Sequence, residues 1–296
     1  MNIKKILVPV DFSPPSILAV NYGIALARKF RARLMLLHVT NAKQAVQRDA
    51  TSALSMLVAP EDQDDLNLAV LTRKGNIEAQ IRAVIAENHV DLLVMGTHGR
   101  RLLGRWIIGS ITQDLLRQSP VPVLTVCHAV RPIEFGHILF ATDGSESAQA
   151  LFPTVLELAQ RLSASVCVVH VVAEPMMLYE GPGNTSLMAE ARAASIERAK
   201  AHLTLLVALG KQQNVKMQSI LLDGDPGVQL LKAAEDGNAD LIAIGVRHRG
   251  RIDRAVFGTC AEALIRQAHI PVLSLHMPTF YQEEHDTQVV GHWEKG

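Results

Sequence analysis

The chain has 296 residues, about twice the length of a typical domain, so two domains are expected. Its 29 basic and 29 acidic side chains give a formal net charge of zero, which argues against broad electrostatic attraction to nucleic acid or to anionic membranes. The apolar runs are far shorter than the roughly 20 residues that a helix needs to cross a bilayer, so no membrane span is expected.

Cysteine spacing and the first residues both favour a cytoplasmic protein. Cys127, Cys167 and Cys260 are far apart and form no C-x-x-C pair, so reduced thiols are expected. The chain opens directly into an apolar run at residues 6–10, which is too short for a signal peptide. We therefore expect a cytoplasmic location.

The first half alternates short apolar runs with amphipathic stretches, which is typical of a parallel α/β sheet with right-handed crossovers. Ser13 and Pro14 favour the start of the first helix, as cap and first-turn residue. The acidic stretch 61–65 is expected to be a loop. Strands are expected over 6–10, 33–39, 66–71, from Asp91, and over 121–126, with helices from Ser13, over 43–58 and over 75–87.

The second half repeats this order after a short linker. We expect a first domain over 1–127, a linker over 128–136, a second domain over 137–276 and a tail over 277–296. Strands are expected over 137–142, 166–172, 215–222, 241–244 and 270–275, helices over 147–162, 187–209 and after Pro226, and a loop over 175–186. The histidines at 276, 285 and 292 match no zinc-binding spacing, so no metal site is expected.

The two halves are an internal repeat of a whole domain. Residues 75–126 align without gaps to 224–275 at a constant offset of 149, and 14 of the 52 positions are identical. The aspartates that end the first strand of each half, Asp11 and Asp143, are offset by 132. Chance rarely preserves glycines, register and strand order together.

Several residues of the first half converge on one candidate site. In an open parallel sheet, ligands bind at the carboxyl ends of strands where neighbouring crossovers go to opposite faces. Asp11 and Gly96 both follow expected strands, and Gly96 and Gly99 permit close backbone approach and positive φ. Gly109 and Ser110 open the next helix, whose first amides suit a phosphate. Together these residues describe a nucleotide-sized pocket.

Each residue also has a purely structural interpretation. Gly96 could be a strand-exit turn, Ser110 a helix cap, and Asp11 a cap of the first helix beside Ser13. His98 and the following arginines could be a solvated basic loop. The agreement of glycines, strand ends and spacing favours the functional interpretation.

The pattern Gly96-x2-Gly99-x9-Gly109-Ser110 resembles the nucleotide-binding signature of the universal stress protein family. The opening run 6–13, the strand and loop 91–99, and the Pro122-Val123-Leu124 run are similar to that family as well. The resemblance covers nearly all of both halves. It implies two tandem five-stranded parallel-sheet domains of the adenine nucleotide alpha hydrolase-like type, with strand order 3-2-1-4-5. It also implies that ATP, with Mg, binds where the motif is complete.

The same resemblance assigns residues of the first half to the nucleotide. Those expected to border the adenosine, line the ribose-phosphate loop and hold the phosphates are, in chain order, Pro9, Val10, Asp11, Val39, Met95, Gly96, His98, Gly99, Gly109, Ser110, Ile111 and Thr112.

The second copy departs from the pattern at one glycine. His248 stands where the first half has Gly99, and a β-carbon there would disturb a loop that must approach phosphate. Gly250 could act as a displaced glycine, and arginines at 247, 249, 251 and 254 could still attract an anion. A second nucleotide site therefore stays open, and its residues would be Asp143, Gly245, Gly258 and Thr259.

The family resemblance also bears on partners. Fifth-strand edges form dimer contacts in the family, so the runs 121–126 and 270–275 are expected to pair the two domains as an internal pseudo-dimer. A homodimer and an unidentified protein partner are compatible with this arrangement. No nucleic acid or membrane partner is expected.

Three functions remain open from the sequence. The protein could be a regulatory ATP-binding protein of the stress response, a slow ATP hydrolase, or a scaffold independent of nucleotide. Hydrolysis needs a positioned base or an acid that binds metal, and His98 is the one obvious candidate, with a ribose or phosphate contact favoured for it. We therefore expect no catalytic residue. A flavin-binding carrier is disfavoured by the sparse aromatic residues.

Overall fold

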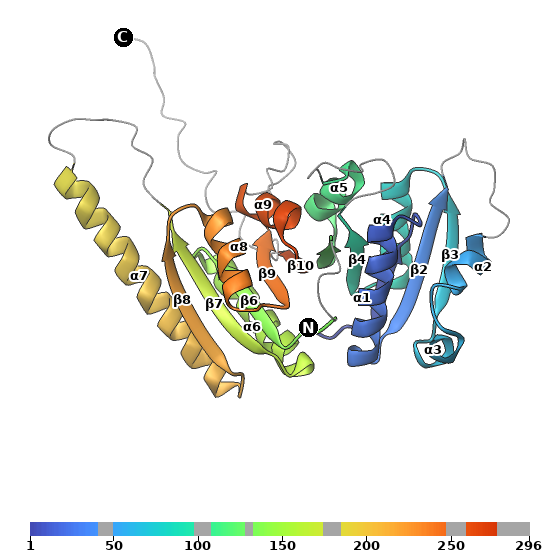
Figure 1. The fold of residues 1–296 in the computed structure, drawn as a ribbon, viewed down its shortest axis with the longest axis horizontal. Helices are drawn as coiled ribbons and strands as arrows, with labels where there is room; N and C mark the ends of the chain where they lie inside the picture. Colours follow the sequence, from blue (N-terminus) through green and yellow to red (C-terminus); the bar gives the residue numbers. More distant parts are fainter. Residues whose placement is uncertain (41–49, 98–107, 128–132, 174–184, 247–258, 277–296) are drawn as a thin grey trace, which may run out of the picture.

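The computed structural model describes residues 1–40, 50–97, 108–127, 133–173, 185–246 and 259–276, with the side chains of 185–187 left aside. The described residues form one continuous ten-stranded sheet in the order β3-β2-β1-β4-β5-β10-β9-β6-β7-β8, covered by helices on both faces (Figure 1). Each half has the order 3-2-1-4-5 when counted from its own first strand, which confirms the expected fold class.

The element bounds follow from the structure. The strands are β1 (Lys5–Pro9), β2 (Arg33–Thr40), β3 (Ala69–Lys74), β4 (Leu92–Gly96), β5 (Val123–Val126), β6 (His137–Thr142), β7 (Ser165–Val172), β8 (Met217–Asp223), β9 (Leu241–Val246) and β10 (Val272–His276). The helices are α1 (Pro14–Phe30), α2 (Ala50–Ser55), α3 (Pro60–Asp65), α4 (Ile77–Asn88), α5 (Ser110–Gln118), α6 (Glu146–Leu162), α7 (Thr185–Gln212), α8 (Pro226–Asp236) and α9 (Thr259–Gln267).

The halves join through their fifth strands. β5 and β10 pair antiparallel, with Leu124 opposite Leu273, while every other strand pair is parallel. The hydroxyl of Thr125 donates to the carbonyl of Val272 at 3.2 Å across this seam. The expected internal pseudo-dimer is therefore present.

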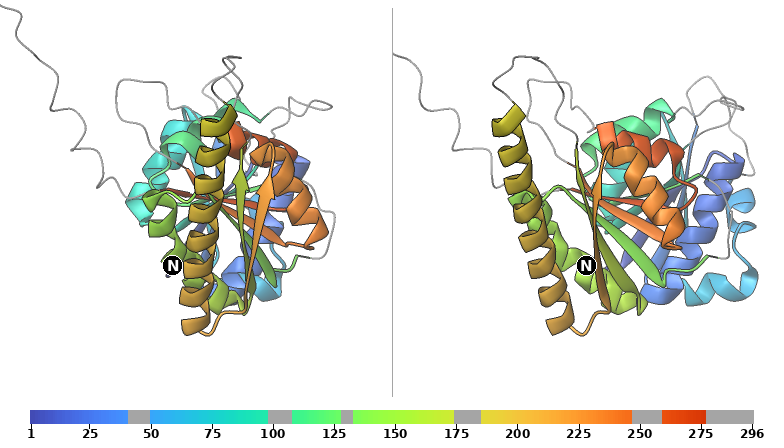
Figure 2. Two further views of the ribbon diagram at one scale, coloured as in Figure 1. Left: turned by 90° about the vertical axis from the view of Figure 1, so that its left-hand side faces the viewer. Right: turned by 60° about the vertical axis from the view of Figure 1, so that its left-hand side comes forward.

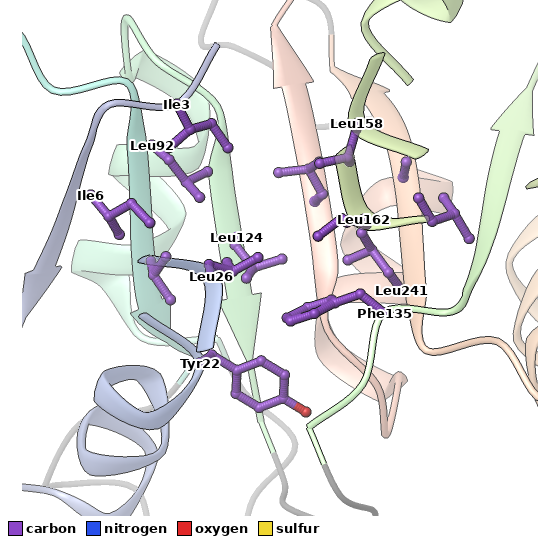
Figure 3. Close-up of a cluster of buried hydrophobic side chains, with 14 of the residues drawn as sticks. Ile3, Ile6, Tyr22, Leu26, Leu92, Leu124, Phe135, Leu158, Leu162 and Leu241 are labelled. Carbon is purple, nitrogen blue, oxygen red and sulfur yellow. The ribbon is translucent and has the colours of Figure 1, made fainter. Parts of the chain in front are cut away.

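Apolar side chains run across the seam on both faces of the sheet. One cluster packs α1, α6 and α7 on one face, and the other packs α4, α5, α8 and α9 on the opposite face. Figure 3 shows leucines of both halves facing one another across β5 and the strands beyond it, with Phe135 of the linker between them. The N-terminal ammonium of Met1 pairs with Glu157 of the other half. The two halves thus share one core.

The longest helix covers the outer edge of the second half. α7 lies along β7 and β8 and spans the full height of the sheet (Figure 2). Its extent is longer than the expected 187–209. Among the described residues, every helix is too short or too polar to span a lipid bilayer.

The expectations for residues 43–71 were partly wrong. The acidic stretch is a helix, α3, because Pro60 occupies its first turn and Glu61 and Asp62 lie at the positive end of the helix dipole. Asn67 has a φ of 43°, a left-handed turn that delays β3 until Ala69. Within the described part of the expected helix 43–58, α2 covers Ala50–Ser55.

Some expected elements lie wholly or partly outside the residues that the structure describes. Residues 41–49 and most of the expected loop 175–186 lie outside the described residues. The tail 277–296 lies outside them as well.

Candidate functional site

Two first-half segments expected at the site do meet at one edge of the sheet. β1 pairs in parallel with β4, with Ile6 opposite Leu92, so Asp11, which follows β1, and Gly96, the last residue of β4, lie at the carboxyl ends of adjacent strands. The helix that follows β1 packs on one face, while α4 and α5 pack on the other. This is the switch point at which ligands bind in open α/β sheets.

Asp11 organises the turn into α1. Its Oδ1 accepts the backbone N–H of Ser13 at 3.0 Å and the Ser13 hydroxyl at 2.5 Å. The Ser13 Oγ in turn accepts the amide of Ser16, the cap that was expected. Asp11 therefore has a structural role in the turn. Its carboxylate lies beyond the carboxyl end of β1.

Two residues that the sequence did not flag hold this turn in place. His38, on β2, donates from Nδ1 to the carbonyl of Val10 at 2.7 Å, and its ring lies 5.1 Å from that of Phe12. Phe12 has a φ of 62°, which is costly for a bulky residue. The second copy has Gly144 at the same position with a φ of 75°. Both halves therefore have a left-handed residue directly after the strand-ending aspartate. The glycine at this position in the second half is the sequence signal that could have predicted the tight turn in both.

Gly96 is required by packing rather than by a left-handed backbone. It is the last residue of β4 and is not among the positive-φ residues of the described chain. A β-carbon at Gly96 would lie 2.7 Å from the carbonyl carbon of Pro15 in the first turn of α1. Of the two properties that glycine permits, Gly96 therefore uses the close backbone approach, to α1, and not a positive φ.

The N-terminus of α5 is anchored to the same edge. The amide of Gly109 donates to the carbonyl of Thr97 at 2.9 Å, and the amide of Thr97 donates to the carbonyl of Val126 at 3.0 Å. The Thr112 hydroxyl donates to the carbonyl of Gly96 at 3.1 Å. These bonds fix the first turn of α5 beside the end of β4.

The sequence suggested Ser110 as the N-cap of α5, but the structure places Gly109 there. Gly109 is the N-cap and makes no side-chain cap bond, while Ser110 is the first helical residue and is exposed. The first amides of a helix have no partner within the helix and lie at the positive end of its dipole. An exposed hydroxyl beside these amides is an arrangement that can hold an anion.

The remaining expected residues differ in how accessible they are. Val10 and Met95 are buried, on opposite faces of the sheet, and Val39 is half-buried at the end of β2. Pro9 ends β1, and Ile111 is half-buried in the first turn of α5. His98 and Gly99 lie outside the described residues.

The second copy repeats the aspartate turn. The Asp143 Oδ1 accepts the amide of Ser145 at 2.9 Å and its hydroxyl at 2.5 Å. Gly245 lies within β9 and Thr259 is the first residue of α9. Gly258 and His248 lie outside the described residues.

A histidine pair beside Asp143 distinguishes the second copy. His202, on α7, is buried, with Nε2 3.2 Å from the Thr142 hydroxyl and Nδ1 3.0 Å from the Gln149 amide nitrogen. The amide nitrogen can only donate, so His202 accepts at Nδ1 and is neutral. His170 occupies the position of His38, and a hydrogen bond with the backbone of Thr142 favours its charged form. Burial lowers the pKa of both imidazoles, partly opposed by Asp143.

The fold and this edge together define a class, the open α/β proteins with a ligand site at the switch point of a parallel sheet. The model of the family described as "Universal stress protein family" matches residues 2–126 and again 134–276. The chain belongs to the universal stress protein family, and it carries the family domain twice.

Individual relatives agree with this assignment. A universal stress protein of Thermus aquaticus is 30% identical over 139 residues, which are 47% of this chain and 97% of that protein. A universal stress protein of Mycobacterium tuberculosis is 23% identical over 292 residues, 90% of this chain and 95% of that one. The crystal structure of a universal stress protein from Archaeoglobus fulgidus has a TM-score of 0.68 at 20% identity, and the match covers 93% of this chain and 99% of that one. The last match extends the likeness of fold to both halves.

The Gly96→Ala substitution should destabilise the protein by about 1–3 kcal/mol, because the added β-carbon forces α1 away from β4. Urea unfolding measures this loss. Gly136→Ala is the matched control, since its nearest neighbour would be Asp240 Oδ2 at an ordinary 3.6 Å. If the two variants had the same free energy of unfolding, α1 could shift away from β4 at no cost in stability, which would contradict this account.

Stability should fall as the pH is lowered from 7 through 5, and part of this fall should come from His202. Its pKa is lowered in the folded state, so the unfolded chain binds more protons below the ordinary histidine pKa of about 6.5. The stability is complete above that pH and is lost as the pH falls through the folded-state pKa. Chemical unfolding at several pH values should show a shallower fall for His202→Gln. An unchanged slope would contradict the neutral assignment.

Proposed function

We propose that the first half binds ATP at the carboxyl ends of β1 and β4, and that the protein is a cytoplasmic regulator of a stress response. Its nucleotide state would alter the binding of a protein partner. The supporting observation is the convergence of the Asp11 turn, the end of β4 and the anchored N-terminus of α5 at one edge of the sheet. Membership of the universal stress protein family supports the regulatory role.

The parts of this edge suit different parts of a nucleotide. The Asp11 carboxylate would accept hydrogen bonds from sugar hydroxyls or an adenine amine, and the half-buried Val39 would pack on the base. The first amides of α5 and the Ser110 hydroxyl would donate to phosphate oxygens. Gly99 would let the loop backbone approach the phosphates.

Mg²⁺ would arrive with ATP rather than occupy a protein site of its own. Within the described ranges, no three histidine, cysteine or carboxylate side chains gather so as to hold a metal ion. Mg²⁺ commonly binds through substrate phosphates and several waters, with few protein ligands. A nucleotide site with few acidic groups is compatible with that mode.

The first half would be the one competent site. Asp143, Gly245 and Thr259 retain their positions in the second half, but the sequence places His248 where Gly99 stands in the first. We also propose the domain bounds 1–127 and 137–276. β5 and β10 already pair with each other, so a homodimer would have to use a different surface.

Replacing Ser110 by alanine should weaken MgATP binding about tenfold, because one hydrogen bond to a charged phosphate is lost. Thr259→Ala removes the equivalent hydroxyl in the second half and should change the affinity less than about twofold. Isothermal titration calorimetry measures both. Equal weakening by the two variants, or weakening by Thr259→Ala alone, would contradict a single site in the first half.

Two further measurements separate the alternatives. Gly99→His copies the second half into the first, and it should abolish phosphate-dependent binding while adenosine still binds.

Phosphate release well above about 0.02 per second would favour an enzyme over a regulator, since enzymes usually turn over about 1–1,000 times per second. If the wild-type protein bound no adenine nucleotide, the ATP-binding proposal would be wrong and a nucleotide-independent scaffold would be the remaining function.

A further inference from the structure

A cavity of about 470 Å³ lies between the two halves, at the end of the sheet opposite the proposed nucleotide site. Its walls come from α1 of the first half, the linker residue Glu134, the end of α8 and the segments leading into β9 and β10. The volume falls within the roughly 300–1,000 Å³ usual for small-molecule sites. The cavity is therefore large enough for a small organic ligand.

Small residues line this cavity. Ala234 and Ala239 line it, and the repeat aligns them with Ile85 and Val90, which are buried in the first half. The first half therefore has larger side chains at both positions. Tyr22, on α1, closes the cavity from the other half.

The charged groups among the described lining residues are acidic. Asp240 is half-buried, while Glu134 and Glu235 are exposed at the mouth of the cavity, and none of the lining residues that the structure describes is a lysine or an arginine. None of these three carboxylates forms a salt bridge with another described residue. His269 also lies at the mouth. The polar rim therefore attracts cations.

The aspartate of the first half has a different environment. Asp91 Oδ2 accepts the amides of both Lys4 and Lys5, at 2.8 and 2.9 Å, and Lys5 Nζ donates to the carbonyl of Asn88 at 2.6 Å. At Asp240 the sequence has Gly136 and His137 instead, and Oδ2 accepts the His137 amide at 2.9 Å. The second half thus lacks the local lysines that accompany the first aspartate.

Tyr22 supplies a polar atom inside the cavity. Its side chain is only 6% exposed, and none of the hydrogen bonds between described residues involves its hydroxyl. Burial, followed by the charge of Asp240, raises the pKa of the phenol, so it remains a neutral donor and acceptor. Figure 3 shows the hydroxyl pointing away from α1, below Phe135. A hydroxyl that lines a cavity and bonds no other described residue is available to a water or a ligand.

We propose that this cavity binds a small amphipathic cation, an apolar body carrying one protonated amine. The apolar body would lie against the alanines and Ile242. The ammonium would donate to Asp240 and to the Tyr22 hydroxyl, and the two glutamates would attract it to the mouth. An ammonium has three donors and no acceptor, which matches carboxylates and a phenol oxygen. This site is independent of nucleotide binding.

Three probes of similar size and different charge test the proposal on the full chain. They are 2-phenylethylammonium, 2-phenylethanol and 3-phenylpropanoate, and protein-detected NMR or calorimetry measures their affinities. The cation should bind with a dissociation constant on the order of 1 mM, as expected for about nine heavy atoms. The alcohol should bind at least about tenfold more weakly, because it lacks the charged hydrogen bond. No binding of the cation, or equal binding of the three, would overturn the proposal.

Variants locate the binding. Asp240→Asn keeps an acceptor for the His137 amide, and it should weaken the cation at least about tenfold. Asp91→Asn is the matched control in the first half and should leave the affinity unchanged. The double variant Ala234→Ile with Ala239→Val installs the first-half residues and should abolish binding. Full affinity in Asp240→Asn would place the cation elsewhere and overturn the proposal even if the double variant fails to fold.

Discussion

The antiparallel pairing of β5 with β10 is the constraint on which the rest of the molecule depends. A parallel sheet is stable only when both of its faces are covered, and each half alone would leave a fifth-strand edge with unpaired backbone groups. Pairing the two edges satisfies those groups and lets the apolar clusters on both faces run across the seam. The seam therefore makes one core from two repeated domains. It also creates the boundary at which Tyr22 of one half meets the acidic cavity of the other.

Sharing a core frees the two halves to differ in their sites. The first half keeps a complete glycine pattern, while the second has a histidine at one position. At the opposite end of the sheet the second half has two alanines that line a cavity, where the first half has the larger isoleucine and valine. Each half is the structural partner of the other, so one can lose a feature without loss of the fold. Both proposals, the nucleotide site of the first half and the cation site of the second, rest on differences in sequence between the two copies.

The sequence predicted most of the architecture because the relevant signals are local. Continuous apolar runs predicted the buried strands, and Ser13 predicted the start of α1. The family resemblance implied the strand order and the pairing of the halves. The errors came from interactions that local patterns do not contain. Gly96 is a glycine because Pro15, distant in sequence, approaches within a β-carbon's reach. Similarly, β3 begins at Ala69 and not at residue 66, because Asn67 adopts a left-handed conformation that the neighbouring sequence does not predict.

The structure brings together the segments that the sequence expected to converge, and it gives two of their residues other local roles than expected. Asp11, Gly96 and the start of α5 do converge, as the switch-point rule requires. The capping role expected of Ser110 belongs to Gly109, which leaves the Ser110 hydroxyl exposed. His38 was missed, because a histidine inside an apolar strand gives no sign that it bonds the carbonyl beside Asp11. Only the folded chain brings these two strands together.

Counting the ATP molecules bound per chain tests the asymmetry of the two halves most directly. Native mass spectrometry of the intact protein, titrated with MgATP, resolves chains that carry no, one or two nucleotides. One competent site predicts that binding saturates at one ATP per chain. Saturation at two would show that the second half also binds ATP despite His248, and no bound nucleotide at any concentration would contradict nucleotide binding by the first half.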